Sequence, residues 1–231
     1  MSPGHLAVVV GATGGIGSAV YAQLERDPRF DRVIGFSRRT DPSVDLTDEA
    51  SIAAAAARIA RQPLDLRLII LATGVLQTKD IAPEKSWRSL EPETLARTFA
   101  VNAIGPALLM KHFLPLLPRA GKSIFATLSA RVGSIGDNQL GGWYGYRASK
   151  AALNQFVRTA AIELTRQRPD AICVALHPGT VDTALSAPHA KTGLDVRTSD
   201  QAAALLLATL DRLTPENSGQ FWDLEGREIA W

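Results

Sequence analysis

Cysteine is almost absent from this chain of 231 residues. The single Cys173 excludes an intramolecular disulfide, and its place in the apolar run AICVAL favours a buried hydrophobic side chain over a nucleophile. Long apolar runs are also missing. Leu6–Val10 leads straight into a glycine turn and is too short for a secretory signal, and no stretch is long enough to span a bilayer. We therefore expect a cytoplasmic protein with no membrane partner.

The chain also lacks an excess of charge of either sign. The formal net charge is +2 at pH 7, and the basic residues are scattered, so we expect no nucleic-acid partner. With 46% hydrophobic and 21% charged residues, the composition is that of a globular protein. The length suits one domain, which we expect to span residues 1–231, and we expect no metal site.

Short β-rich apolar runs alternate with longer helix-like stretches. Each run is nearly continuous in apolar residues, which is typical of a strand covered on both faces. The alternation predicts an α/β fold with right-handed crossovers: one doubly wound, Rossmann-type parallel sheet with helices on both faces. The expected strands are Leu6–Val10, Val33–Ser37, Leu66–Ala72, Ser123–Ser129, Ala171–His177 and Gln220–Leu224. The expected helices are Ile16–Glu25, Asp48–Ala60, Pro92–Leu117, Tyr146–Arg166 and Ser199–Leu213, and Gly136–Gly142 is an expected loop.

A glycine-rich turn follows the first expected strand and opens the first expected helix. Missing Cβ atoms let the backbone approach a pyrophosphate, and the helix start offers free N–H groups and a positive dipole end. We interpret the turn as a dinucleotide site rather than a simple tight turn. It is not a P-loop, because no Lys-Ser/Thr pair closes the glycine motif. The expected contacts are Gly11, Thr13, Gly14, Gly15, Ile16 and Gly17.

The end of the second expected strand distinguishes the two nicotinamide cofactors. An NAD enzyme has a carboxylate there that binds the ribose 2′-hydroxyl. In this chain Ser37 is followed by Arg38 and Arg39, which would bind a 2′-phosphate unless both arginines are merely solvated. NADP(H) is therefore favoured over NAD(H). Asp45, followed by Leu46, either frames the adenine or caps the nearby helix.

Tyr146 and Lys150 are four residues apart in a helix-like stretch, so their side chains share one face. A nearby ammonium favours the phenolate, so we expect Lys150 to lower the tyrosine pKa and make the pair a general acid or base. Upstream, Pro106 has no N–H for the Asn102 carbonyl. We expect a kink and a free acceptor for water at Asn102, although the proline could simply bend the helix.

These motifs fall in one order along the chain: GATGGIG, Asp45, Thr73-Gly74, Asn102, Ser129, Tyr146-x-x-x-Lys150 and Pro178-Gly179-x-x-x-Thr183. In this order they resemble the classical short-chain dehydrogenase/reductase family over the whole chain. The segments DNQLGGWYGYRASKAALN and GQFWDLEGREIAW are similar to its C-factor-like, carbonyl-reductase-like subgroup. The resemblance implies an NADP(H)-dependent enzyme that interconverts a small-molecule carbonyl and alcohol. It also implies a homodimer or homotetramer paired through the two long helices. An NADP(H)-binding sensor without turnover is the alternative.

The family implies a role for each matching residue. Tyr146 would exchange the proton, Lys150 would lower its pKa and bind the nicotinamide ribose, and Asn102 would hold a water that joins Lys150 to solvent. His177 would be structural, since Tyr146 already serves as the base. The remaining cofactor contacts would be Ala72, Thr73 and Gly74 after one strand and Pro178, Gly179, Val181 and Thr183 after another.

The chain departs from the family pattern at two strand ends. The family often has Asn-Asn-Ala-Gly where this chain has Leu71-Ala72-Thr73-Gly74, so the bracing asparagine hydrogen bonds are lost. The family's second serine, which polarises the substrate carbonyl, aligns with Ala130. We expect Ser129 to replace it, narrowly ahead of Ser134, or Tyr146 to act unaided. Strand neighbours point to opposite faces, so Ser129 reaches the cleft only if the strand twists or bulges.

Three segments are expected to surround the substrate: Thr78–Trp87, Gly136–Gly145 and Ala184–Arg197. Trp87, Trp143 and Tyr144 would line an apolar pocket, or would pack structurally. Within the third segment we expect a mobile lid at Ala187–Gly193.

Overall fold

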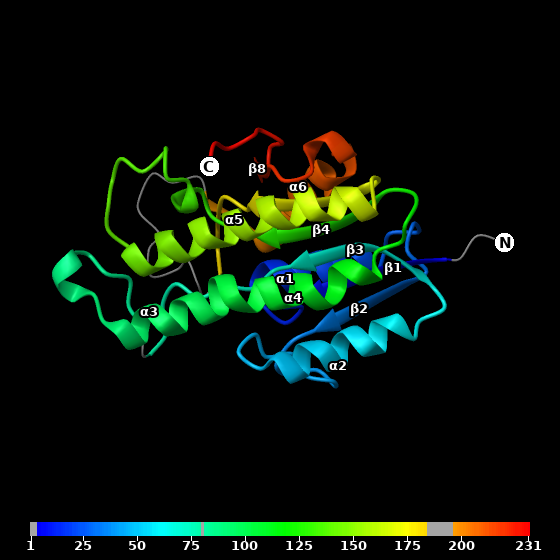
Figure 1. The fold of residues 1–231 in the computed structure, drawn as a ribbon, viewed down its shortest axis with the longest axis horizontal. Helices are drawn as coiled ribbons and strands as arrows, with labels where there is room; N and C mark the ends of the chain where they lie inside the picture. Colours follow the sequence, from blue (N-terminus) through cyan, green and yellow to red (C-terminus); the bar gives the residue numbers. More distant parts are fainter. Residues whose placement is uncertain (1–3, 80, 184–195) are drawn as a thin grey trace.

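A six-stranded parallel sheet forms the centre of the molecule, in the order β2-β1-β3-β4-β5-β8 (Figure 1). The structure is a computed structural model that describes residues 4–79, 81–183 and 196–231. The strands are β1 (His5–Val10), β2 (Arg32–Phe36), β3 (Asp65–Leu71), β4 (Ser123–Leu128), β5 (Ala171–His177) and β8 (Phe221–Asp223). The predicted doubly wound sheet is confirmed, and each predicted strand is present to within one residue at either end.

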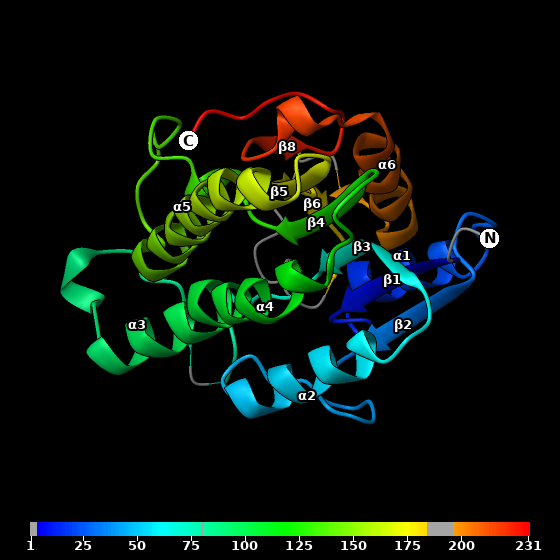
Figure 2. The ribbon, with the colours of Figure 1, turned by 45° about the vertical axis from the view of Figure 1, so that its right-hand side comes forward.

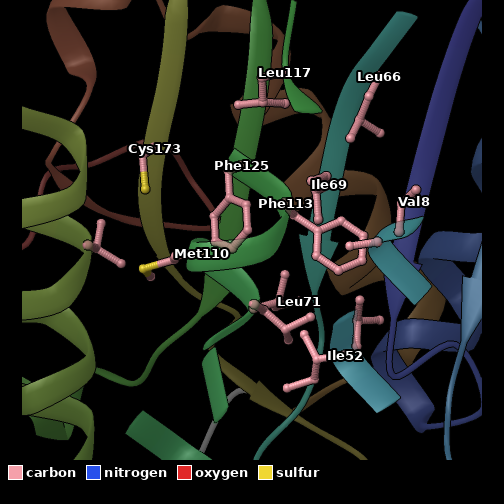
Figure 3. Packing of buried hydrophobic residues seen from close by; sticks show 14 of the residues in the cluster. Val8, Ile52, Leu66, Ile69, Leu71, Met110, Phe113, Leu117, Phe125 and Cys173 are labelled. Atoms are coloured by element: carbon pink, nitrogen blue, oxygen red, sulfur yellow. The ribbon is translucent and has the colours of Figure 1, made fainter. Parts of the chain in front are cut away.

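Helices cover both faces of this sheet (Figures 1 and 2). One face carries α2 (Glu49–Ala60), α4 (Gly105–Phe113) and α5 (Tyr144–Gln167), and the other carries α1 (Gly15–Leu24) and α6 (Ser199–Arg212). Because strand side chains alternate, Val8 packs in the first layer and Val9 in the second. Cys173 is fully buried in the first layer, near Met110 (Figure 3). Its burial confirms the prediction of a buried hydrophobic residue, and it also raises the pKa of the thiol to about 12.

The long helix predicted at Pro92–Leu117 changes its winding along its length. It consists of α3 (Pro92–Phe99), a π-helical turn (Ala100–Ile104), α4 and a 3₁₀ turn (Leu114–Leu116). The N–H of Gly105 donates to the carbonyl of Ala100, five residues back. The local effect expected of Pro106 therefore takes the form of a widened turn around Asn102, a type of irregularity frequent at functional sites.

One stretch of this helix, Pro92–Leu116, is long and apolar enough to cross a membrane, so the expectation that the chain has no such stretch is wrong. Leu109 and Phe113 of this stretch are fully buried in the sheet-facing layer. Lys111 forms an ion pair with Glu49 of α2 at 2.6 Å, and the Nε2 of His112 lies 2.9 Å from the same Glu49 oxygen. These contacts pack one side of the stretch against the sheet and against α2.

Local contacts move the ends of several elements. Helix α2 is capped by Asp48, whose side chain accepts from the N–H of Ala50. Helix α5 begins at Tyr144, two residues before its predicted start. A small parallel sheet joins β6 (Thr180–Val181) and β7 (Val196–Arg197) and was not predicted. Short 3₁₀ turns lie at Trp87–Ser89, Arg131–Gly133 and Pro215–Asn217, and the predicted loop at Gly136–Gly142 contains no helix or strand.

Candidate active site

The strand order reverses between β1 and β3, so the loops after these strands diverge and leave a crevice at their carboxyl ends. A cleft of about 830 Å³ lies there. It brings together most residues predicted to bind the cofactor or to act in catalysis. These are Gly11, Thr13, Gly14, Gly15, Ile16, Ser37, Arg38, Arg39, Asp45, Leu46, Ala72, Thr73, Gly74, Ser129, Tyr146, Lys150, Pro178 and Thr183.

Four predicted residues do not line this cleft and instead support it. A Cβ on Gly17 would lie 2.1 Å from the Gly11 carbonyl oxygen, so this glycine lets helix α1 pack against the turn. Gly179 turns the chain after β5 with φ +72°, and Val181 is buried in β6. Asn102 is only 1% exposed and lies behind Gly74, whose Cβ would come within 3.5 Å of the Asn102 Oδ1.

The glycine turn leaves polar groups open to a ligand. Gly11 has φ +92°, and a Cβ there would lie 2.6 Å from the Ala72 carbonyl, so the turn after β1 depends on glycine. Gly14 is the N-cap of α1 and offers no side-chain oxygen to the first amides of that helix. Thr73 has a buried hydroxyl with no hydrogen-bond partner in the described residues. A ligand oxygen in the cleft would satisfy these donors.

Arg38 and Arg39 line the part of the cleft that lies after the end of strand β2. Ser37 is buried, and its hydroxyl accepts from the N–H of Arg39 at 3.0 Å. Arg38 and Arg39 are exposed, and neither forms an ion pair with another residue of the described segments. Asp45 accepts from the N–H and hydroxyl of Thr47, which, with the nearby Arg38, lowers the pKa of its carboxyl group. Asp45 therefore stabilises its own turn and does not cap α2.

Tyr146 and Lys150 lie one turn apart at the start of α5. The Lys150 Nζ is 5.9 Å from the centre of the tyrosine ring and donates to the Leu128 carbonyl at 2.9 Å. Burial raises the pKa of Tyr146 to about 12 and lowers the pKa of Lys150 to about 8. The lowering of the tyrosine pKa expected from Lys150 is not seen in this structure, where the loss of hydration on burial raises it.

A hydrogen-bonded chain connects Asn102 to the backbone of Tyr146. The Asn102 Oδ1 accepts from the Val75 N–H and its Nδ2 donates to the Val75 carbonyl, both at 2.8 Å. The same Nδ2 donates to the Ser149 hydroxyl at 3.2 Å, and Ser149 donates to the Tyr146 carbonyl at 2.8 Å. Sequence reasoning missed Ser149, whose place directly before Lys150 was the only available signal. The π turn and the end of β3 are thereby fixed to α5.

Ser129 lines the cleft, but its hydroxyl is engaged elsewhere. It donates to the Asn154 Oδ1 of α5 at 2.6 Å, and the Asn154 Nδ2 donates to the Gly133 carbonyl at 3.4 Å. Ser134 accepts from the Asp137 N–H and does not line the cleft. The buried Asn154 was also missed, since no sequence motif pairs it with Ser129. Of the two candidate serines, only Ser129 reaches the cleft, with its proton directed away from it.

The expected substrate segments are only partly near this site. The ring of Trp143 meets that of Tyr146 edge-on at 6.2 Å, whereas Trp87 is 68% exposed and lies outside the cleft. Burial lowers the pKa of His177 to about 4, and its Nδ1 accepts from the Arg131 N–H, which supports a structural role. The proposed lid at Ala187–Gly193 lies outside the described residues.

These observations define the class as a Rossmann-type α/β protein with a tyrosine–lysine pair in the cleft at its strand ends. A family model described as "Enoyl-(Acyl carrier protein) reductase" matches residues 19–212. The chain belongs to the short-chain dehydrogenase/reductase family and is an oxidoreductase of that family.

Relatives of the chain include enzymes and a signalling protein. It is 32% identical over 236 residues to 1-hydroxy-2-glutathionyl-2-methyl-3-butene dehydrogenase of Rhodococcus sp. (strain AD45), covering 97% of this chain and 98% of that protein. It is 38% identical over 138 residues to the C-signal of Myxococcus xanthus, covering 59% and 78%. Among solved structures, the NADPH-bound carbonyl reductase from chicken fatty liver has a TM-score of 0.87 at 26% identity, covering 100% and 96%. The resemblance to the carbonyl-reductase-like and C-factor-like subgroup is thus confirmed.

Proposed function

We propose that this protein uses NADP(H) to interconvert a carbonyl and an alcohol on a small molecule, with Tyr146 exchanging the proton. The observation that carries the proposal is that one cleft contains the Tyr146–Lys150 pair, the glycine turn and the arginine pair at Arg38 and Arg39. The chicken carbonyl reductase with bound NADPH has the same fold, and the Rhodococcus relative is a dehydrogenase.

The residues of the cleft fit NADP(H). The exposed guanidinium groups of Arg38 and Arg39 suit a 2′-phosphate, and the glycine turn with the open start of α1 suits a pyrophosphate. The unpartnered hydroxyl of Thr73 suits a ligand oxygen in the cleft. Pro178 and Thr183 would line the nicotinamide end, with Gly179 and Val181 shaping the backbone behind them. When bound, the cofactor supplies or accepts the hydride.

The protein's own part of the reaction is proton transfer and orientation. A pKa of about 12 keeps Tyr146 protonated at neutral pH, so it can donate its proton to a developing alkoxide. Lys150 would then stabilise the phenolate with its ammonium. Asn102 holds the π turn and α5 together, and a water on its carbonyl would connect Lys150 to solvent. Because Ser129 donates to Asn154, Tyr146 is the main donor that polarises the carbonyl.

Turnover assays with matched variants test this proposal. Purified protein with NADPH and a panel of aldehydes, ketones and quinones should oxidise the cofactor. Tyr146→Phe should lower kcat by roughly 10²- to 10⁴-fold, the usual contribution of a general acid. Tyr144→Phe, two residues upstream and outside the cleft lining, is the control and should retain activity. Wild-type activity in Tyr146→Phe would refute the proposal, and an unchanged preference for NADPH over NADH in Arg38→Ala/Arg39→Ala would refute the cofactor assignment.

A second function is a sensor that binds NADP(H) without turnover. Two observations favour it: Ala130 stands where the family has its second serine, and the C-signal is among the relatives. Tight NADPH binding with no oxidation by any carbonyl of the panel is the result expected of a sensor.

We also propose that the protein forms a homodimer through its two long helices, the one that contains the π turn (Ala100–Ile104) and α5. Ile104, Phe156 and Ile162 expose 50%, 41% and 48% of their surfaces on the outer side of this helical layer. Leu153 of α5 is fully buried in the core and does not belong to this surface.

A further inference from the structure

Helix α5 has no cap of its own at the end that carries Tyr146. The residue before its first turn is Trp143, with φ +52°, and an indole ring has no oxygen that could accept from a backbone amide. The first four N–H groups of a helix have no partner within the helix and are satisfied from outside. The partner of this helix start must therefore come from another segment.

Glu84 provides that partner from a distant segment of the chain. Its Oε2 accepts from the Gly145 N–H at 3.0 Å, and its backbone carbonyl accepts from the Trp143 N–H at 2.5 Å. The residue is 6% exposed, so both contacts are shielded from water. A carboxylate at this position also faces the positive end of the helix dipole.

Gly145 leaves the room that this carboxylate occupies. A Cβ on Gly145 would lie 2.8 Å from the Glu84 Oε1 and 3.0 Å from Leu95 of α3. Any side chain at the residue directly before Tyr146 would therefore displace the carboxylate or the helix start. The acidic residue, Glu84, and the glycine that leaves space for it, Gly145, are 61 residues apart in the sequence.

Glu84 also belongs to the segment that forms one wall of the cleft. Gln77, Thr78 and Ile81 of this segment line the cleft, and Glu84 follows Ile81 by three residues. The two hydrogen bonds thus fasten the cleft wall to the first turn of α5.

We propose that Glu84 is a positioning residue for Tyr146, which replaces the missing helix cap and sets the tyrosine relative to the cleft wall. This inference rests on the proposed function for its catalytic consequence. Its structural part, the protection of the Gly145 amide by the Glu84 carboxylate, can be measured without any turnover.

Three variants test the role of Glu84. Glu84→Ala should lower kcat about 10- to 100-fold, because a catalytic group misplaced by ~1 Å loses activity on this scale. The KM for NADPH should change much less, because Glu84 does not line the cleft. Glu84→Gln keeps an acceptor oxygen and should recover most of the lost kcat. The control is Glu91→Ala, because Glu91 is the N-cap residue of α3 but its side chain makes no cap hydrogen bond.

Amide hydrogen exchange supplies the second readout. The Gly145 amide should exchange faster in Glu84→Ala than in the wild type, and Glu84→Gln should restore its protection. Unchanged protection in Glu84→Ala, or equal losses of kcat in Glu84→Ala and Glu91→Ala, would overturn the proposal. If the wild type reduces no carbonyl of the panel, the proposed function fails, while the exchange rates still decide the contact. If Glu84→Ala does not fold, Glu84→Gln supplies the test. The proposal is overturned if this variant loses the protection of the Gly145 amide but keeps the kcat of the wild type.

Discussion

We expect Ser129 to contribute more to the stability of the protein than to its catalysis. Its hydroxyl donates to the buried Asn154, so Ser129→Ala leaves the Asn154 Oδ1 without that donor. We expect a loss of about 1–3 kcal/mol in the free energy of unfolding, the cost of an unsatisfied buried polar group. The loss of kcat should be far smaller than in Tyr146→Phe. Urea unfolding and steady-state kinetics measure the two effects, and a loss of kcat as large as that of Tyr146→Phe would contradict the assignment.

Lys150 makes the stability of the protein depend on pH in a defined direction. Burial lowers its pKa from 10.5 to about 8, so between these values the unfolded chain binds more protons than the folded protein. The free energy of unfolding should therefore rise with pH across this window, by at most ~3 kcal/mol from this group. Urea unfolding of the wild type and Lys150→Met from about pH 7.5 to 9.5 isolates the contribution as a growing difference. A difference that stays constant with pH would show that Lys150 is not desolvated.

The sequence predicted these residues unevenly. Tyr146, Lys150 and Asn102 follow from local spacing and from a family pattern, and the structure brings them together. Glu84 and Asn154 act through partners 61 and 25 residues away, and such pairings depend on how segments pack. The raised pKa of Tyr146 was not predicted, because burial is a property of the whole fold and not of local spacing.

At the scale of elements, two glycines at the start of helix α1 are expected to have different roles, one in stability and the other in cofactor binding. A Cβ on Gly17 would lie 2.1 Å from the Gly11 carbonyl oxygen, so Gly17→Ala should lower stability by about 1–3 kcal/mol through overpacking. A Cβ on Gly14 meets nothing closer than 3.4 Å, and this residue lines the cleft. Gly14→Ala should thus keep its stability and lose NADPH affinity. Thermal unfolding and NADPH fluorescence titration decide between these outcomes, and equal stability of the two variants would contradict them.

Periodicity and turn residues were sufficient to predict the strands and helices, because each buried strand and each amphipathic helix has a pattern of its own. They did not predict the π turn at Ala100–Ile104 or the small sheet of β6 and β7. The first arises where Pro106 interrupts an otherwise regular helix, and the second pairs two segments of only two residues each. Neither leaves a repeating pattern in the sequence.

At the scale of the whole molecule, the exposed apolar side chains of the π turn (Ala100–Ile104) and of α5 predict self-association. Phe156→Glu and Ile162→Glu would bury carboxylates in the proposed interface, and unpaired buried charges are costly. We expect the wild type to scatter light as a dimer and the double variant as a monomer. Leu140→Glu changes a residue that is 90% exposed on a separate loop, and it should remain dimeric. A wild-type monomer at all concentrations would exclude this interface.

The inaccessible thiol of Cys173 has a practical consequence for spectroscopy. A sulfur that is fully covered, with a pKa near 12, carries almost no thiolate at neutral pH and should resist maleimide reagents while the protein is folded. A cysteine introduced at a solvent-facing position such as Leu140 would then be the only group labelled by a fluorophore. Probes can therefore be attached to the loop that precedes Tyr146 without replacing Cys173 first.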